Sequence, residues 1–360
     1  MTAQTVLDKV KLHGLDSLEE FSIRINRHED GRVILNYNML ESPKTDPITI
    51  GCRSLTISER GELIARGFDR FFNCNEALDI TNKFDWENPI TAYDKIDGSF
   101  IKIFYWNGWK IQTRNSFGDA EVQVVENGVY KGCGYSWSDL VKQGLSDSFF
   151  SDASTNYTFI FELTSPYNKV VQTHNEVSVW LLTIFNGLDE LSDDEIDTIG
   201  RELGLKRPAR HTFYSMAEVK NYISKEASHD KTFEGVVLKD VNGLRLKVKS
   251  EAYVALHRLF DNGNVILDKN IVPLILDGEI EEVLSYFPHI KERVTSLKSK
   301  IEEYKREVDD HWYVYSDEKS RKKFAQAVKD CRWNSLLFLA YERGGHPFNY
   351  LTSDFVVKFL

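Results

Sequence analysis

The chain has 360 residues, of which 42% are hydrophobic and 12% aromatic, and this length predicts two domains because single cores stop growing at about 250–300 residues. It contains no run of about 18 apolar residues, which excludes a transmembrane helix, and its first residues, MTAQTVLDKVKLHG, lack the apolar centre of a secretory signal. The formal net charge of −10 argues against a protein that coats nucleic acid nonspecifically.

The charge is unevenly distributed along the chain. Residues 289–360 hold 14 Lys and Arg against 11 Asp and Glu, which leaves 31 against 44 in the remainder. A basic C-terminal part can bind a polyanion locally and in a salt-sensitive way. The alternative is that these charges are the solvated faces of helices.

The four cysteines are scattered and none forms a C-x-x-C pair, which argues against a zinc ribbon or a redox motif. Few, isolated cysteines are typical of a reducing compartment. We therefore expect a cytoplasmic protein with no membrane partner.

The N-terminal two thirds of the chain alternate strand patterns with helix signals. Strands are expected at 32–39, 48–57, 106–113, 157–163, 177–184, 233–238 and 244–249. Residues 118–153 are expected to be helical and rich in loops, with a short helix beginning near Ser136. This pattern predicts an α+β domain with antiparallel sheets that covers residues 1–254.

The sequence turns helical after that point. Ile290, Val294, Leu297, Ile301, Tyr304 and Val308 recur with helical spacing. Two further helices are expected at 317–329 and 332–343, and Gly344-Gly345 should end the second. Residues 255–360 are therefore predicted to form an all-helical C-terminal domain.

The stretch Lys95-Ile96-Asp97-Gly98-Ser99 has two interpretations. Asp97-Gly98 between two apolar segments is a common hairpin signal, which would make Lys95 a solvated strand residue. A lysine at a turn can instead form a covalent bond to phosphorus if its amine is neutral and correctly aimed. The hairpin is the more frequent case for these five residues taken alone.

Two carboxylates and one basic strand bear on this choice. Glu162 stands in an apolar strand, YTFIFEL, where a buried carboxylate needs a partner, although an edge position facing solvent is the alternative. Glu234 stands at the start of another strand. Residues 245, 247 and 249 place Arg, Lys and Lys on one face of a strand, about 7 Å apart. Three aligned cations favour a bound anion, while a solvated sheet face is the more common arrangement.

These residues together describe nucleotidyl transfer through a phosphoramidate. Lys247 and Lys249 are expected to lower the pKa of Lys95 by like-charge repulsion. The same cations, with Arg53, would hold a triphosphate and stabilise the leaving group. The two glutamates could orient a ribose or hold hydrated Mg²⁺.

The motifs KIDGS (95–99), FIFEL (159–163), EGVV (234–237) and LKVK (246–249) resemble, in this order, the covalent nucleotidyltransferases. Within them the chain resembles the RNA ligases of the phage T4 RNA ligase 1 type. The resemblance includes Tyr37-Asn38, Cys52-Arg53, Arg70–Asn73 and Ser165–Asn168, and it covers roughly residues 30–255. It implies that residues 1–254 form an adenylation domain, with a helical domain after it for RNA specificity.

The resemblance also implies roles for single residues. Lys95 would be the nucleophile that takes AMP from ATP, with Lys247 and Lys249 on the triphosphate. Glu162 would contact the ribose, and Glu234, with Glu162 through water, would hold the metal. Arg70 and Arg114 stand where that ligase type has lysine, so their hydrogen-bond geometry differs while the charge is kept. Further nucleotide-binding positions are Tyr37, Arg53, Asp97, Gly98 and Tyr253.

The implied enzyme is an ATP-dependent RNA ligase that uses ATP and Mg²⁺ or Mn²⁺. It would join RNA 3′-hydroxyl and 5′-phosphate ends through a lysyl-AMP and an RNA-adenylate. It would act as a monomer in RNA repair, and its substrate would be a nicked tRNA anticodon loop. A DNA ligase or a capping enzyme is the alternative, although both usually continue with a β-barrel domain. The second alternative is a non-catalytic RNA-binding relative, and the third alternative is a purely structural α+β protein.

Overall fold

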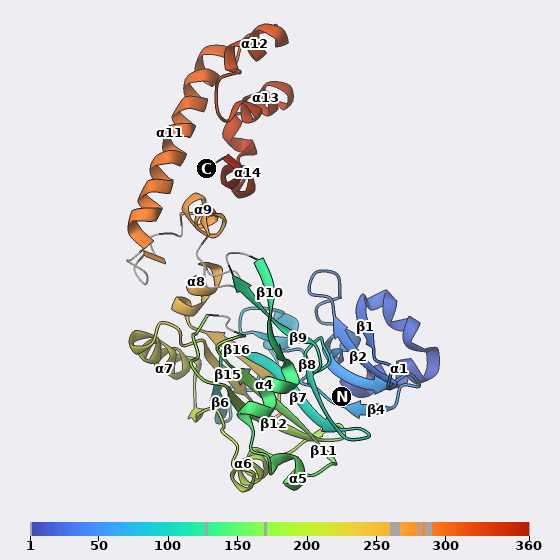
Figure 1. Ribbon diagram of the computed structural model, residues 1–360. Helices are drawn as coiled ribbons and strands as arrows, with labels where there is room; N and C mark the ends of the chain where they lie inside the picture. Colours follow the sequence, from blue (N-terminus) through green and yellow to red (C-terminus); the bar gives the residue numbers. More distant parts are fainter. Residues whose placement is uncertain are drawn as a thin grey trace. The chain divides into compact units, whose positions relative to one another are not determined.

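The computed structural model describes residues 2–126, 129–168, 171–259, 267–278, 280, 283–284 and 290–359. They form two compact units, one with the described residues up to Val254 and the other with those from Ala255 onward. The first unit carries every strand of the described residues, and most of these strands pair antiparallel (Figure 1). The predicted α+β class with a helical C-terminal part is confirmed.

The first unit begins with a small N-terminal sheet. Strands β1 (Ile23–Arg27), β2 (Arg32–Tyr37), β3 (Arg53–Ser58) and β4 (Leu63–Ala65) pair in this order. Helix α1 (Thr2–His13) packs Val6 and Val10 into the core of this sheet. The 3₁₀ helix η1 (Leu15–Phe21) lies between α1 and β1.

The strand expected at 48–57 is wrong in its first half. Helix α2 (Pro47–Gly51) occupies these residues, and β3 begins only at Arg53. Asp46 caps the helix by accepting a hydrogen bond from the Ile48 amide at 2.8 Å, and Pro47 takes the first turn, where a missing N–H does no harm. This cap outweighs the β-branched residues that predicted a strand.

A five-stranded sheet, here the β11 sheet, lies at the centre of the unit. Its order is β13 (Asp189–Glu190), β12 (Ser178–Asn186), β11 (Tyr157–Thr164), β7 (Ser99–Tyr105) and β8 (Trp109–Thr113). Three helices pack against it: α4 (Trp137–Gly144), α5 (Phe149–Asp152) and α6 (Asp193–Glu202). Leu140 of α4 and Phe149 of α5 are part of its apolar core.

The helical expectation for residues 118–153 is only partly right. Strands β9 (Glu121–Glu126) and β10 (Val129–Ser136) form a two-stranded ribbon before the two short helices. The expected helix start at Ser136 is confirmed, because its side chain and that of Asp139 form a reciprocal capping box.

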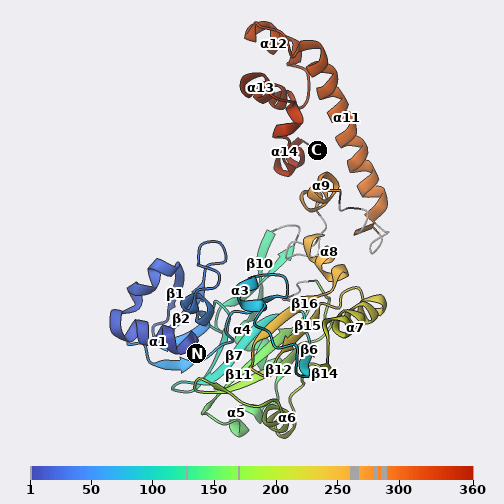
Figure 2. The same ribbon diagram turned by 180° about the vertical axis from the view of Figure 1, so that it is seen from behind.

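A second five-stranded sheet, the β15 sheet, has the order β14 (Arg210–Phe213), β6 (Ile90–Asp94), β15 (Gly235–Lys239), β16 (Arg245–Lys249) and β5 (Phe72–Asn73). All its pairs are antiparallel except β16 with β5. Helix α7 (Met216–His229) lies beside this sheet (Figure 2). Its Val219 and Ile223 belong to the apolar core of the sheet. The short helix α3 (Leu78–Thr81) follows β5 in the chain.

The hairpin interpretation of Lys95–Ser99 is wrong, because β6 and β7 do not pair. β6 pairs with β14 and β15, whereas β7 pairs with β8 and β11. Residues 95–98 therefore connect one five-stranded sheet to the other. Gly98 serves close approach rather than a hairpin turn, since a Cβ there would stand 2.4 Å from the carbonyl oxygen of Leu163.

A fully buried lysine connects the β11 sheet to the N-terminal sheet. Lys102 of β7 is 0% exposed, and its Nζ donates to Thr56 Oγ1 at 2.7 Å and to the carbonyls of Ser54 and Ala65. Burial lowers the pKa of Lys102 well below its usual value, and the charge of Arg32 lowers it further. The three acceptors lie on β3 and β4. The Lys102 side chain therefore links the β11 sheet to the N-terminal sheet.

The described residues of the second unit are helical or irregular. Helix α8 (Glu251–Leu259) begins in the first unit, and α9 (Asp268–Leu276), α11 (Lys291–Tyr315), α12 (Arg321–Val328), α13 (Asn334–Arg343), η3 (Pro347–Tyr350) and α14 (Ser353–Phe359) follow. The predicted apolar stripe of α11 is buried. Trp333 and Phe324 lie at the centre of the core. Within the described residues, every helix is too short or too polar to cross a membrane.

Replacing Lys102 with methionine tests the connection between the two sheets. The change keeps side-chain length but leaves three buried oxygens without their donor, so we expect the free energy of unfolding to fall by about 2–4 kcal/mol. Urea denaturation measures this, and Lys142→Met on the exposed face of α4 is the control, with an effect within about 0.5 kcal/mol. An increase in the free energy of unfolding would mean that removing the amine from water is more unfavourable than its hydrogen bonds are favourable.

Candidate active site

Lys95 lies directly after β6 and is held by its backbone and its side chain. Its amide donates to the Gly235 carbonyl at 2.8 Å, and its Nζ contacts Glu234 Oε2 at 2.8 Å. The other oxygen of Glu234 contacts Lys249 Nζ at 2.9 Å. The Glu234 side chain is only 3% exposed, so one buried carboxylate is shared by two ammonium groups.

The expected depression of the Lys95 pKa is wrong for this state of the protein. Burial alone would lower the pKa, but Glu234 and then Glu162 outweigh burial and raise the pKa of Lys95 above its usual value. The neighbouring lysine behaves in the opposite way. Burial, followed by the charges of Arg53 and Lys95, lowers the pKa of Lys247 to about 7.

A cavity of about 270 Å³ opens beside Lys95 and is lined from both five-stranded sheets. The β15 sheet contributes Val237 and Lys247, which lie directly opposite each other in the strand register. The β11 sheet contributes Phe100 and Glu162, which are also register partners. The cavity therefore has cations on one side and a carboxylate on the other, with apolar surfaces between them.

Glu162 lines this cavity. The sequence predicted that a carboxylate buried in this apolar strand would have a partner. Burial raises the pKa of Glu162 to about 7, against the attraction of Lys95. The strand that carries it, β11, is buried on both sides in most positions. The edge-strand alternative is therefore wrong, because β11 lies between β7 and β12.

Aromatic rings separate the cations along one side of the cavity. The Arg53 guanidinium lies 5.8 Å from the Phe68 ring centroid and 5.0 Å from that of Phe71. The same rings contact two further cations: Arg245 lies 4.9 Å from the Phe68 centroid, and the Lys247 Nζ lies 5.2 Å from that of Phe71. The order cation–ring–cation–ring–cation reduces like-charge repulsion through cation–π attraction. We call these five residues the cation–ring series.

Sequence reasoning missed this role of Phe68 and Phe71. The signal was present in the segment RGFDRFFN (66–73), where phenylalanines alternate with arginines. Burial lowers the pKa of Arg53 to about 10, which still leaves it charged at neutral pH. Two rings in contact with one guanidinium help to keep that charge inside the protein.

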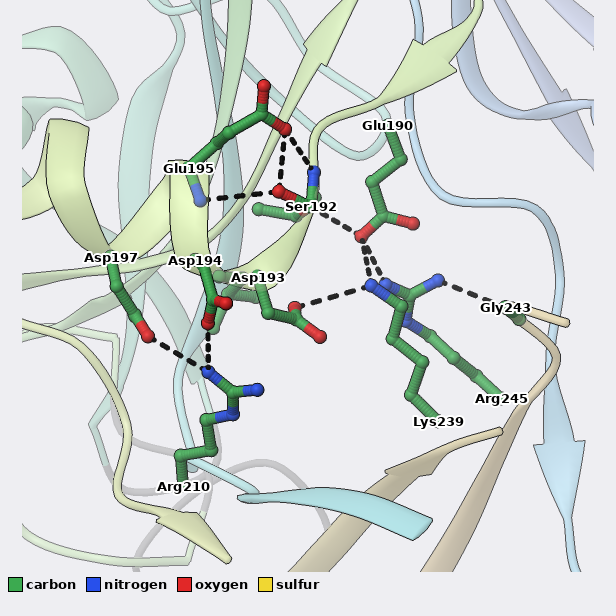
Figure 3. A network of polar contacts seen from close by, with 12 residues as sticks. Glu190, Ser192, Asp193, Asp194, Glu195, Asp197, Arg210, Lys239, Gly243 and Arg245 are labelled. Carbon is green, nitrogen blue, oxygen red and sulfur yellow. Dashed lines mark hydrogen bonds and ion pairs between the residues drawn. The ribbon is translucent and has the colours of Figure 1, made fainter. Parts of the chain in front are cut away.

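Arg245 is neutralised by a carboxylate, unlike Arg53. Figure 3 shows its guanidinium beside Glu190, which also accepts from Lys239 at 3.4 Å, while Lys239 contacts Asp193 at 3.3 Å. Although burial opposes ionisation, Arg245 and Lys239 lower the pKa of Glu190 to about 2. The three cations of β16 therefore divide into Arg245 and Lys249, which have carboxylate partners, and Lys247, which has none among the described residues.

Asp97 anchors the segment that carries Lys95. Its carboxylate accepts hydrogen bonds from the amides of Val171 and Gln172 at 2.8 and 2.7 Å and from the Tyr253 hydroxyl at 2.8 Å. Asp97 is 4% exposed and Tyr253 is 1% exposed. The residues that line the cavity do not include Asp97, Gly98 or Tyr253, so their expected role in binding the nucleotide stays a prediction.

Tyr37, Arg70 and Arg114 form a cluster of their own. The Arg70 and Arg114 guanidinium groups both lie over the Tyr37 ring, at 4.1 and 4.6 Å from its centroid. None of the three lines the cavity beside Lys95. The cluster lies close enough to the cavity for Tyr37 and Arg114 to act on the charge of Arg53, which lines it.

The candidate metal ligands Glu234 and Glu162 both act to raise the pKa of Lys95. No group of three or more His, Cys, Asp or Glu side chains that could hold a metal ion occurs within the described residues. Both oxygens of Glu234 already contact ammonium groups. This donor set fits a divalent ion that keeps most of its water and phosphate ligands, as Mg²⁺ prefers.

A buried lysine in contact with a carboxylate, set beside several cations at the junction of two sheets, is an arrangement that suits nucleotidyl transfer. A family model described as RNA ligase matches residues 51–253, which is more than half of the chain. The chain therefore belongs to the RNA ligase family, and the resemblance stated from its motifs is confirmed.

Relatives with this name occur in viruses. The chain is 27% identical over 337 residues to a protein of Autographa californica nuclear polyhedrosis virus named as a bifunctional polynucleotide kinase/RNA ligase, covering 89% of this chain and 47% of that one. It is 22% identical over 289 residues to an RNA ligase of Rhodothermus phage RM378, covering 66% and 65%. The chain thus spans about half to two thirds of the length of these relatives. An archaeal ATP-dependent RNA ligase aligns with a TM-score of 0.49 and 15% identity, covering 82% of each chain.

The ion cluster around Glu234 predicts opposite shifts for two substitutions. Glu234→Gln removes the main attraction on the Lys95 ammonium, so burial should then lower the pKa of Lys95. Lys249→Met removes a competing cation, so the pKa of Lys95 should rise. The pH dependence of Lys95 acetylation by acetic anhydride, followed by mass spectrometry, measures both, with Lys142 as the reference in the same sample. Shifts of the same sign in the two variants would contradict this account.

Proposed function

We propose that this protein is an ATP-dependent RNA ligase that joins an RNA 3′-hydroxyl end to a 5′-phosphate end through a lysyl-AMP intermediate. The observation that carries the proposal is the position of Lys95, beside Glu234 and at the edge of a cavity that holds Glu162, Arg53 and Lys247. Membership in the RNA ligase family supports the reaction class.

The first step is the transfer of AMP to Lys95. The Lys95 amine attacks the α-phosphorus of ATP, the new bond is N–P, and the bond between the α-phosphorus and the bridging oxygen breaks to release pyrophosphate. Arg53, Lys247 and Lys249 would neutralise the charge that develops on this leaving group. Glu162, on the opposite side of the cavity, would accept a hydrogen bond from the ribose.

Lys95 must lose a proton before it attacks. In the structure its ammonium is stabilised by Glu234 at 2.8 Å, which favours the protonated form. ATP would enter as its Mg²⁺ or Mn²⁺ complex, and the metal would supply positive charge near Glu234 and the α-phosphate. Competition for the Glu234 carboxylate would weaken its hold on Lys95, and the pKa of Lys95 would then fall toward the value set by burial.

The later steps act on RNA. An oxygen of the RNA 5′-phosphate attacks the phosphorus of lysyl-AMP, the P–N bond breaks, and Lys95 leaves as an amine that takes up a proton. A 3′-hydroxyl then attacks the 5′-phosphorus of the RNA-adenylate, and AMP leaves. Both steps depend on in-line geometry and charge neutralisation.

We further propose that the natural substrate is a broken tRNA anticodon loop, on which a monomeric enzyme acts in RNA repair. Residues 255–360 would then choose the RNA. Lys319, Lys322 and Lys323, at the start of α12 or just before it, are exposed and carry positive charge suited to a phosphate backbone.

The covalent intermediate is directly testable. Wild-type protein incubated with α-labelled ATP and Mg²⁺, then denatured, should carry one acid-labile AMP, and Lys95→Ala should carry none. Lys247→Met and Lys249→Met should each reduce the rate of labelling by about 10²–10³-fold, with circular dichroism spectra unchanged. An adduct that persists in Lys95→Ala would place the nucleophile elsewhere, and unlabelled wild-type protein would refute the proposed enzyme.

The role of the helical unit is tested without removing it. In the triple variant Lys319→Gln, Lys322→Gln, Lys323→Gln, AMP labelling of Lys95 should equal that of the wild type. Joining of a nicked tRNA should fall relative to joining of single-stranded RNA and a nicked duplex, and the salt dependence of tRNA binding should weaken. Equal joining of all three RNAs by the variant and the wild type would exclude this surface from substrate choice.

A further inference from the structure

Two tyrosines of the first unit contact each other outside the cavity beside Lys95. Tyr135 lies in β10 and Tyr167 follows β11, and their ring centroids are 5.2 Å apart with the ring planes tilted by 46°. Tyr135 is 37% exposed, and Tyr167 is half-buried. Among the described residues, those that line the cavity include neither tyrosine. The pair is therefore a partly exposed aromatic surface to which the nucleotide cavity gives no role.

A bulge in the two-stranded ribbon presents the ring of Tyr135. Three residues of β10, 133–135, lie opposite the single residue Val122 of β9. Gly134, in the middle of the three, has a φ of 82°, which favours glycine, and its amide donates to Glu121 Oε1 at 2.9 Å. Val122 is buried in the apolar core, whereas Tyr135 is exposed. A bulge changes the direction of a side chain in this way, so the exposure of Tyr135 is built into the strand.

A turn that is tied to the Lys95 segment positions Tyr167. The Tyr167 amide donates to Ser165 Oγ at 3.2 Å. The side-chain amide of the next residue, Asn168, donates to Ser99 Oγ at 2.9 Å and to the Leu163 carbonyl at 2.7 Å. Ser99 begins β7, only a few residues after the proposed nucleophile.

The continuation of this turn is tied to the same segment. Asp97 accepts hydrogen bonds from the amides of Val171 and Gln172, and the His174 ring contacts the Asp97 carbonyl at 2.9 Å. The residues on both sides of this connection are therefore fixed against the segment that carries Lys95. An RNA end that receives AMP from Lys95 has to approach this segment, so the aromatic pair lies close to the path of the strand.

A pair of partly exposed aromatic rings on a fixed support suits the binding of an unpaired nucleobase. Every base has a π-face that stacks on an aromatic ring, so such a contact tolerates any sequence. A single exposed aromatic residue is common on protein surfaces, but here two rings meet and each is held by backbone contacts of its own. Membership in the RNA ligase family supplies the macromolecule that carries such bases.

We propose that Tyr135 and Tyr167 form a stacking platform that binds an unpaired nucleobase of the RNA near the end to be joined. This inference rests on the proposed function, because it concerns the RNA that receives AMP from Lys95. The platform adds affinity without adding charge, since the phosphates are bound elsewhere. The base belongs either to the 5′-phosphate strand or to the 3′-hydroxyl strand, which offer the same chemistry to the rings.

Leucine substitutions test the platform, because leucine keeps apolar volume but has no ring. Fluorescence anisotropy measures the binding of single-stranded RNA to the full-length protein. Tyr135→Leu and Tyr167→Leu should each weaken binding by about 5- to 50-fold, whereas Tyr135→Phe and Tyr167→Phe should stay within about threefold of the wild type. The salt dependence of binding should be the same in all variants, because no phosphate contact is lost.

RNAs with one abasic residue identify the base and its strand. In the wild type, removal of the stacked base should weaken binding by about the same factor as Tyr135→Leu does. In Tyr135→Leu the same removal should have little further effect, because the ring that the base contacts is already absent. Abasic residues placed in turn near the end of each strand show which strand is bound. Losses that simply add at every position would mean that the tyrosines touch no base and would overturn the proposal.

Tyr105→Leu is the matched control. Tyr105 is 46% exposed at the other end of β7 from Ser99, and its ring lies 5.7 Å from that of Trp109, so it also belongs to an exposed aromatic pair. Its substitution should leave RNA affinity within about twofold of the wild type, and a loss equal to that of Tyr135→Leu would contradict a site at the tyrosine pair.

AMP labelling of Lys95 in the same variants separates this proposal from the proposed function. The labelling rate of Tyr135→Leu and Tyr167→Leu should stay within about threefold of the wild type, because the first step involves no RNA. Loss of labelling together with loss of RNA binding would assign the tyrosines to packing and overturn the platform. Unchanged RNA affinity in both variants would refute the platform alone, whereas absence of lysyl-AMP in the wild type would refute the proposed enzyme.

Discussion

The burial of several positive charges around one cavity is the constraint on which the rest of this site depends. Removing cations from water is unfavourable unless each has a compensating neighbour. The protein uses two kinds of neighbour. Glu234 and Glu190 form ion pairs with four cations on or beside the β15 sheet, and aromatic rings contact Arg53 and Lys247. Within the described residues, Arg53 and Lys247 form no ion pair, and both line the cavity where a phosphate would bind.

This division explains why the three basic residues of β16 are not equivalent. Arg245 forms an ion pair with Glu190, and Lys249 shares Glu234 with Lys95. Lys247 has neither partner, and burial and neighbouring cations bring its pKa to about 7. Binding of a triphosphate would stabilise the charged form of Lys247, so the affinity for an anion is linked to proton uptake at this residue.

The sequence predicted which residues gather near Lys95 better than it predicted how the strands pair. Alternation along 244–249 was enough to place Arg245, Lys247 and Lys249 on one face, because the strand period is local. The apolar neighbours of Glu162 likewise predicted burial. Pairing between distant strands is not local, so the separation of β6 and β7 into two sheets could not be derived from a short turn signal. The cluster of Tyr37, Arg70 and Arg114 depends on three such long-range arrangements.

The link between the two sheets gives the Lys-x-Asp-Gly sequence a physical meaning that a hairpin would not. The Lys95 amide donates a hydrogen bond to the Gly235 carbonyl of β15. The chain then enters β7 of the β11 sheet at Ser99, a few residues later. Asp97 fixes this passage by binding the amides of Val171 and Gln172, and Gly98 allows the backbone to lie against Leu163. The lysine is therefore presented at the junction of two rigid layers, with Glu234 on its own sheet and Glu162 on the other. A nucleophile that must meet a phosphorus atom in line benefits from this placement, because its approach is set by two cores rather than by a flexible turn.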